Sequence, residues 1–205
     1  GRLSVFHAIE GAPPVDLVSD DAALIQYITY PNGQDGFVTV DIIATTYNFR
    51  ATRNLDQAQT IIDLGEVNLQ ARQNTFLVLI GTPDNPTYSI FIEDIQAMKR
   101  AEHPPLRIDI PDDARQGFVR LGHFASGAPN VDLIINGELS AVSDLPFATI
   151  STFVELPAGT HTVIIVTGEV QLVTEFTLQV ASGTWQTIGL IVDGHVLAGE
   201  DVLDK

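Results

Sequence analysis

The sequence contains no cysteine and almost no lysine. None of its 205 residues is Cys, and Lys occurs only at positions 99 and 205. A domain of about 100 residues can bury a core without disulfides, so the missing cysteine costs no necessary crosslink, but it removes the usual sign of an oxidising compartment. Scarce lysine together with many Thr, Val and Ile residues favours an exported β protein.

Long apolar runs and a basic face are also missing. Runs such as residues 77–80 and 163–166 fall far short of the roughly 20 residues that cross a bilayer. The chain opens on strand-like residues 3–6 without a charged, apolar leader, as a processed chain would. Its formal net charge of −16 repels phosphate backbones and anionic lipids. We therefore expect neither nucleic-acid binding nor direct membrane insertion.

Motifs of catalysis and cofactor binding are absent as well. The sequence has no G-x-S-x-G, no phosphate-binding glycine loop and no H-x-H or H-x3-H pair. We therefore expect no enzyme, no catalytic residues, no metal centre and no cofactor, although acids brought together only in space escape this test. Calcium stays open, because loop oxygens could bind it, and a solvated acidic turn is the favoured interpretation of both runs. The two runs are Ser19, Asp20 and Asp21, and Asp109, Asp112 and Asp113.

The most informative feature present is a repeated peptide, H-x-x-x-G-A-P-x-V-D-L, at residues 7–17 and 123–133. Its glycine permits a strained turn, its proline fixes φ, and Val-Asp-Leu re-enters a strand, so the motif is predicted to join two strands. We expect its His and Asp to satisfy buried loop groups or each other, and a His-Asp metal or acid–base site is the weaker reading. The positions concerned are His7, Gly11, Pro13 and Asp16 in the first copy, and His123, Gly127, Pro129 and Asp132 in the second.

Short apolar runs separated by turn signals predict strands throughout and no convincing helix. In the second copy Asn136-Gly137 predicts a two-residue hairpin, residues 150–156 a single strand, and 157–159 a turn. Aligning the copies by their apolar runs matches Phe76 with Trp185, and a matched aromatic of this kind is usually core. Alternation of apolar and polar residues favours two tandem β-sandwiches. The predicted boundaries are 1–95 for the first repeat, 96–117 for an acidic, Pro-containing linker, and 118–205 for the second repeat.

This motif, its duplication and the later Leu156-Pro157-Ala158-Gly159-Thr160-His161-Thr162-Val163 segment resemble the bacterial and archaeal family called domain of unknown function 4397. The family pattern is similar to H-A-S-P-D-A-P-x-V-D-V followed by L-P-A-G-x-Y-x-V. Gly11 and Gly127 stand where that pattern has an acid, and His161 where it often has Tyr. The first copy lacks the L-P-A-G turn, so its assignment rests on the first motif. The resemblance implies an all-β fold of immunoglobulin-like or transthyretin-like sandwiches, secreted or on the cell surface, without established catalytic residues.

Two segments outside the repeated motif are candidates for contacts with partners. Leu106, Ile108 and Ile110 alternate with charged residues between prolines, as in a short edge strand that could be added to another sheet. The segment from Tyr27 to Gly36 holds a polar loop with two aromatics, Tyr27 and Tyr30, at its base, and this loop, which includes Asn32 and Asp35, is the best place for a ligand.

Two hypotheses about function follow from these features. The first is a non-enzymatic extracellular structural or interaction protein, a self-assembling or filament-type subunit that uses β-strand addition and contacts itself or other surface proteins. It loses its best mechanism if the terminal segments, residues 2–6 and 196–203, pair only within their own domains. The alternative is a carbohydrate- or small-ligand-binding module, with calcium as a conceivable aid. That alternative predicts exposed aromatics near Tyr30 or Trp185, where the first predicts buried ones.

Overall fold

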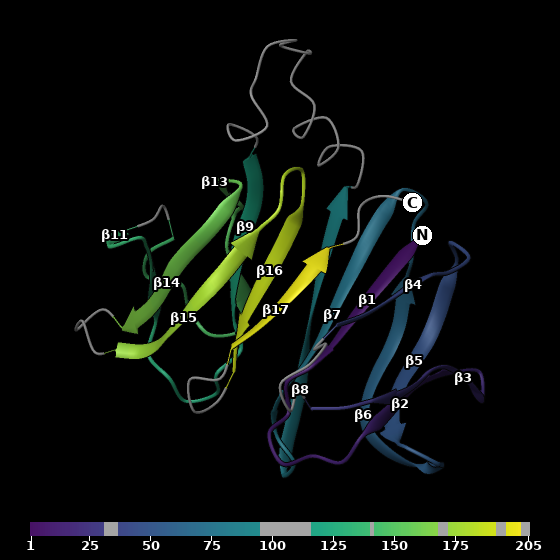
Figure 1. Ribbon diagram of the computed structural model, residues 1–205. Helices are drawn as coiled ribbons and strands as arrows, with labels where there is room; N and C mark the ends of the chain where they lie inside the picture. The colour runs from purple at the N-terminus through teal and green to yellow at the C-terminus, as the bar shows by residue number, and fades with distance from the viewer. Residues whose placement is uncertain (31–36, 95–115, 140–141, 168–171, 192–195, 202–205) are drawn as a thin grey trace. The chain divides into compact units, whose positions relative to one another are not determined.

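The computed structural model is built of strands, and it describes residues 1–30, 37–94, 116–139, 142–167, 172–191 and 196–201. The described residues contain no helix, and hence no helix that could cross a membrane. The chain divides into two compact units, Gly1–Lys99 (unit 1) and Arg100–Lys205 (unit 2), shown in purple to teal and in green to yellow in Figure 1. The prediction of an all-β chain is confirmed.

Unit 1 is a sandwich of two four-stranded sheets, in the orders β4-β1-β7-β8 and β3-β2-β5-β6. All neighbouring strands are antiparallel except β1 and β7, which run parallel. Strand β1 pairs with β4 on one side and β7 on the other, so it lies in the interior of its sheet. The strands are β1 (Arg2–His7), β2 (Val15–Ser19), β3 (Ala22–Ile28), β4 (Phe37–Asp41), β5 (Thr46–Arg53), β6 (Asp56–Asn68), β7 (Gln73–Thr82) and β8 (Asn85–Asp94).

Unit 2 repeats this plan with shorter strands in one sheet. Its sheets have the orders β11-β10-β14-β15 and β12-β9-β16-β17, and β13 also pairs with β9. Here β9 and β16 are the parallel pair. The strands are β9 (Gln116–His123), β10 (Val131–Ile135), β11 (Glu138–Leu139), β12 (Thr149–Ile150), β13 (Val154–Pro157), β14 (Gly159–Thr167), β15 (Leu172–Val180), β16 (Trp185–Leu190) and β17 (Val196–Asp201).

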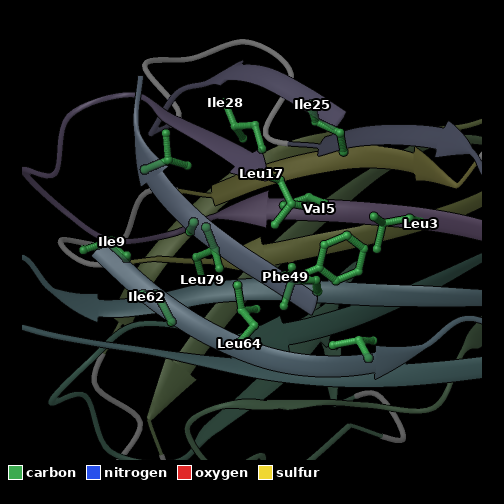
Figure 2. Close-up of a cluster of buried hydrophobic side chains, with 14 of the residues drawn as sticks. Leu3, Val5, Ile9, Leu17, Ile25, Ile28, Phe49, Ile62, Leu64 and Leu79 are labelled. Atoms are coloured by element: carbon green, nitrogen blue, oxygen red, sulfur yellow. The ribbon is translucent and has the colours of Figure 1, made fainter. Parts of the chain in front are cut away.

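The core of unit 1 lies between its two sheets and is made by alternate residues of their strands. Leu3 and Val5 of β1 and Leu77 and Leu79 of β7 meet Leu17 and other apolar residues of the second sheet (Figure 2). The period of two residues in a strand explains this pattern, because side chains two apart share one face. Figure 2 shows Phe49 as the one aromatic ring among the labelled side chains. Unit 2 has an equivalent core, which includes Val119, Leu121, Leu133, Ile165 and Ile188.

The predicted turns and strands of unit 2 are partly right. Asn136 and Gly137 both have positive φ, at 52° and 85°, and join β10 to β11, which confirms the predicted hairpin. Residues 150–156 do not form one strand but are divided between β12 and β13. Between them the hydroxyl oxygen of Ser151 accepts the N–H of Leu121 at 3.0 Å, so a side chain replaces a backbone carbonyl of the ladder and the strand is interrupted.

The sequence match of Phe76 with Trp185 was wrong by two residues. Leu79 pairs with His7 and Leu190 pairs with His123, so Leu79 and Leu190 are equivalent positions in the two units. Counting back from each, Phe76 is equivalent to Thr187, and Asn74 is equivalent to Trp185. A slip of two residues leaves every side chain on the same face of a sheet. An alignment of apolar runs therefore cannot detect it.

Each unit has a buried phenylalanine near the end of its first strand, but at a different position: Phe6 lies in β1, whereas Phe124 follows β9. Phe6 of unit 1 corresponds to Gly122, and Ala8 corresponds to Phe124. Both phenylalanines are fully buried, and the ring of Phe124 folds back over Gly122, where a Cβ would lie 2.5 Å from its Cζ atom. Unit 2 therefore requires a residue without a side chain at position 122.

We expect Gly122→Ala to destabilise unit 2 by about 1 to 3 kcal/mol, since the added methyl group overpacks a buried ring. In a Phe124→Ala background the same change should cost almost nothing, because the ring is gone. A double-mutant cycle measured by urea unfolding tests this coupling. Additive effects of the two changes would contradict it.

Candidate functional site

The repeated peptide forms the passage from one sheet to the other, joining β1 to β2 and β9 to β10. After the last paired residue of β1, the N–H of Ala8 still donates to the carbonyl of Leu79 at 2.6 Å, and Phe124 donates to Leu190 at 2.8 Å in unit 2. The chain then leaves the sheet through a tight turn, which in unit 1 is closed by the N–H of Ala12 and the carbonyl of Ile9 at 3.3 Å.

The motif glycine makes this turn sterically accessible. Gly11 has φ of 69° and Gly127 has φ of 80°, in the left-handed region that side chains disfavour. This is the third residue of the turn, the position at which type II turns favour glycine. The acid that the family pattern carries at this place is replaced here by the residue with the lowest conformational cost.

The motif histidines are buried beneath the loop that they belong to. His7 and His123 are both fully buried, and their Nε2 atoms lie 3.2 Å from the carbonyl oxygen of Pro13 and 3.0 Å from that of Pro129. In His7 the Nδ1 atom accepts the N–H of Ile9 at 3.3 Å, so Nε2 must carry the proton that it donates to Pro13. Each ring thus ties the start of the loop to its end.

Burial keeps these imidazoles neutral. It lowers the pKa of both His7 and His123 below the ordinary value of 6.5, although the bond to the proline carbonyl acts in the opposite direction. An aromatic ring stands edge-on to each histidine, Tyr30 at 6.3 Å between centroids in unit 1 and Phe147 at 6.0 Å in unit 2. These apolar walls are consistent with a neutral, structural imidazole.

The motif aspartate of unit 1 holds three separate segments together. Asp16 accepts from the backbone N–H of Tyr27 at 2.9 Å, from the side-chain amide of Asn54 at 2.7 Å and from the N–H of Leu55 at 3.3 Å. Burial would raise the pKa of this carboxyl, but the three donors outweigh it and hold the pKa below its ordinary value. Asp16 is therefore a buried anion that is stabilised by donors and not by a cation.

Asp132 has a smaller version of this role in unit 2. Its Oδ1 atom accepts the N–H of Asp144 at 2.6 Å, and the residue is only half-buried. The two copies therefore share a contact with the segment that returns beside the motif strand, which is β3 in unit 1 and the bend at Asp144 in unit 2. The additional contact with the β5–β6 turn is seen in unit 1.

The chemistry of this arrangement is structural. Both nitrogen atoms of His7 are engaged by backbone groups, and both oxygens of Asp16 accept hydrogen bonds. Both ring positions of His7 are therefore occupied, and the Asp16 carboxylate accepts three bonds from protein donors. Among the described residues no three His, Asp or Glu side chains come close enough to hold a metal ion.

The other candidate positions divide into two groups. Asp20 and Asp21 form the β2–β3 turn, and Asp21 pairs with Arg50 at 3.0 Å, so this acidic run works as a hairpin turn. Tyr30 is half-buried against His7. The remaining candidates lie outside the described residues: Asn32 and Asp35 of the ligand loop, Leu106, Ile108 and Ile110 of the strand-addition segment, and Asp109, Asp112 and Asp113.

Trp185 is 4% exposed and belongs to an aromatic cluster in unit 2. It stacks on Phe118 with centroids 4.2 Å apart, and Phe153 meets it edge-on at 4.5 Å. The guanidinium of Arg120 lies 4.5 Å from the centre of the Phe153 ring, and its Nε donates to the hydroxyl of Thr187 at 2.9 Å. Trp185 is thus enclosed by neighbours and not open to solvent.

Sequence reasoning missed one polar cluster and the partners of Asp16. His161 is buried, and its Nε2 donates to the carbonyl of Pro157 at 2.8 Å, while Nδ1 accepts from the side chain of Asn136 at 2.9 Å. This cluster fastens the L-P-A-G segment to the Asn136-Gly137 turn. No sequence signal marked it, because His7 and His123 precede their proline partners by six residues, whereas His161 follows Pro157 by four.

Residues 117–197, within unit 2, match the family model described as Domain of unknown function (DUF4397). The match runs from β9 into β17. No curated protein matches the chain.

We expect Asp16→Ala to lower the free energy of unfolding by about 2 to 4 kcal/mol, because three part-buried donors lose a charged acceptor. Asp132→Ala is the matched control and should cost about 1 kcal/mol, since the described structure gives it one backbone donor. Urea unfolding measures both. Equal costs would contradict the role assigned to Asp16.

Acidification should destabilise the fold through the histidines. Their folded pKa lies below the unfolded one, so the unfolded state binds more protons and stability falls as pH drops below about 6.5. The melting temperature of the wild type should therefore fall between neutral pH and pH near 5, and less steeply in His7→Gln, whose amide can donate to Pro13 without titrating. Asp16 acts in a separate window, because its stabilisation is lost only as pH falls below about 4. Identical profiles for wild type and variant above that window would contradict the assignment.

Proposed function

We propose that this chain is a non-enzymatic structural or interaction protein that acts outside the cell, at the cell surface. Its partners would be copies of itself or other surface proteins. The observation that carries the proposal is the use made of the motif residues: His7 and His123 are buried and bonded within the loop that joins the sheets, and Asp16 is buried and bonded to β3 and to the β5–β6 turn. The side chains with acid–base groups in this motif are thus the ones that stabilise the fold.

Open sheet edges support an interaction role. In unit 1, β6 is the edge of the sheet β3-β2-β5-β6, and its first five residues, 56–60, are all exposed. An edge strand presents unpaired backbone groups to which an extended segment can be added. Strand addition to β6 is therefore the mechanism that we propose for a contact of this kind.

The terminal strands do not supply the added segment in this structure. Strand β1 lies between β4 and β7, and β17 pairs with β16, so both are paired within their own units. This removes the donor that a filament would use most simply. The segment with Leu106, Ile108 and Ile110 stays the predicted donor and lies outside the described residues.

A carbohydrate- or small-ligand-binding module, with or without calcium, is the competing proposal. It requires an exposed aromatic platform, whereas Trp185 is 4% exposed and Tyr30 is half-buried. The burial of Trp185 favours the structural proposal, whereas Tyr27, three residues before Tyr30, is 64% exposed and supports the competing proposal at that loop.

We further infer that both units are immunoglobulin-like or transthyretin-like domains that arose by duplication. In each unit the chain alternates between the two sheets in the same way. The first strand lies in one sheet, the next two lie in the other, and the last two return to the first sheet. Both units also contain one parallel pair, formed by the first strand and the penultimate one. The extracellular location rests on the family resemblance of the repeated motif and on the low lysine content.

Assembly of the purified protein tests this proposal. We expect light scattering and electron microscopy at neutral pH to show self-association that does not depend on calcium. Immunogold labelling of intact cells should place the protein outside. A monomer that binds glycans with a shift in tyrosine or tryptophan fluorescence would instead establish the competing proposal.

A further inference from the structure

Two residues of unit 1 combine a strained backbone with an exposed apolar side chain. Tyr27 has φ of 60° and Leu55 has φ of 63°, in the left-handed region that costs bulky residues most. Their side chains are 64% and 91% exposed. Packing inside the unit therefore does not repay the strain.

Asp16 holds both residues in this conformation. Its Oδ1 atom accepts the N–H of Tyr27 and its Oδ2 atom accepts the N–H of Leu55, so one buried carboxylate fixes two peptide groups from different hairpins. At Tyr27 the pairing of β2 with β3 is also shifted by a bulge between Val15 and Leu17. Bulges often redirect a side chain, and here the result is a rigid pair of apolar groups at one end of the sheet. We call Tyr27 and Leu55 the apolar tip.

Unit 2 shows that the backbone geometry does not need a tyrosine. Asp144 takes the place of Tyr27: its N–H donates to Asp132, and its φ is 52°. Asp and Asn tolerate this region far better than aromatic residues do. Leu55 likewise occupies the third position of the turn between Arg53 and Asp56, where Gly or Asn is favoured when φ is positive. Strain that the fold itself does not require points to a contact with another molecule.

The distribution of exposed apolar residues favours a second copy of this chain as that molecule. Unit 1 contains every exposed large hydrophobic residue of the described part of the chain: Leu24, Tyr27, Ile43, Leu55, Tyr88 and Ile92. Among them Ile43 is 78% exposed and lies just before β5, whereas Leu55 lies just after it. A strand rises about 3.3 Å per residue, so the eight residues of β5 separate the two positions by roughly 25 Å. The apolar tip and Ile43 are therefore at opposite ends of one sheet.

Charged side chains flank both ends. Arg53, beside Leu55, is exposed and bonds to the neutral side chain of Gln59 at 3.4 Å. Asp41, two residues before Ile43, pairs with Arg2 but keeps a side chain that is 79% exposed. Asp56, on the other side of Leu55, is exposed as well. Each end therefore offers apolar side chains together with charges of both signs, Arg53 and Asp56 at the tip and the Arg2–Asp41 pair near Ile43.

We propose that the apolar tip of one copy docks against the Ile43 end of unit 1 in a second copy. Such a contact joins two different surfaces, so it repeats from copy to copy and need not close. Tyr, Leu and Arg at a rigid, preorganised position lose little conformational freedom on binding. This inference rests on the self-association in the proposed function and names the surfaces that carry it.

Complementary variants of the full chain test the contact. Leu55→Asn and Tyr27→Asn remove the tip, Ile43→Asn removes the opposite end, and Ile92→Asn is the control, since Ile92 is 60% exposed but lies on β8. Sedimentation velocity from micromolar to millimolar concentration should show association of the wild type and of the control. Each of the other three variants should associate about tenfold or more weakly, as expected when an anchor residue is lost.

Mixing the blocked variants gives the sharpest result. Leu55→Asn keeps an intact Ile43 end, and Ile43→Asn keeps an intact tip, so an equal mixture should form one-to-one dimers and stop there. A symmetric contact, in which the same patch meets itself, would give no such dimer and would overturn the proposal.

Stability gives an independent readout. Asn adopts the left-handed region readily, so Tyr27→Asn and Leu55→Asn should raise the melting temperature by about 2 to 5 °C, while Ile92→Asn should not. A lower melting temperature in the tip variants would show that these residues serve the fold, and would overturn the inference.

The outcomes also separate this inference from the proposed function. A wild type that associates as strongly as Leu55→Asn and Ile43→Asn overturns the docking contact alone. A wild type that stays monomeric at every concentration overturns the contact and self-assembly together. Binding of phosphatidylcholine vesicles or glycans by the monomer, lost in Leu55→Asn, would assign the tip to a different occupant and would likewise overturn the contact.

Discussion

In each unit the chain must pass from one sheet to the other without leaving buried backbone N–H or carbonyl groups unpaired, and the rest of the structure depends on this passage. An unpaired buried N–H or carbonyl costs about as much as a lost hydrogen bond. The loop between β1 and β2 meets this demand with a neutral histidine that bridges its two ends and with an aspartate that accepts from the following strands. The equivalent loop of unit 2 uses His123 and Asp132 in the same positions. The repeated peptide is therefore best understood as the residues required for this passage.

The residues that face outward carry the consequences for function. In the function that we propose, the buried polar groups serve the fold and specificity comes from edges, turns and exposed side chains. Unit 1 places its exposed large apolar residues at turns and edge strands, and two of them are kept in a conformation that other residues would adopt more easily. Asp16 connects the buried motif with the exposed residues, because its carboxylate accepts the backbone N–H groups of both Tyr27 and Leu55.

Sequence patterns predicted the strands, the Asn136-Gly137 hairpin and the passage motif, because each depends on local rules of alternation and turn geometry. They could not predict the partners of Asp16, since Asn54 and Leu55 lie in a hairpin far along the chain and nothing in their composition marks them. The interruption at Ser151 depends on one hydroxyl that replaces a backbone acceptor. The shifted match of Phe76 with Trp185 failed for a general reason: a slip of two residues preserves the facing of every side chain in a strand. Positive φ at Tyr27 and Leu55 was equally hidden, because turn rules would place Gly, Asn or Asp there.

The central claim is that the motif histidines are neutral structural groups that hold the passage between sheets. Nitrogen-15 NMR of the imidazole rings at neutral pH tests it directly. The account predicts that His7 and His123 both carry their proton on Nε2, take up a second proton only at a lower pH than an ordinary imidazole, and do not respond to added zinc or calcium. A ring that is charged at neutral pH, that carries its proton on Nδ1, or whose nitrogen resonances shift when a metal ion is added would contradict this claim. Such a result would favour a reactive or metal-binding role for the motif.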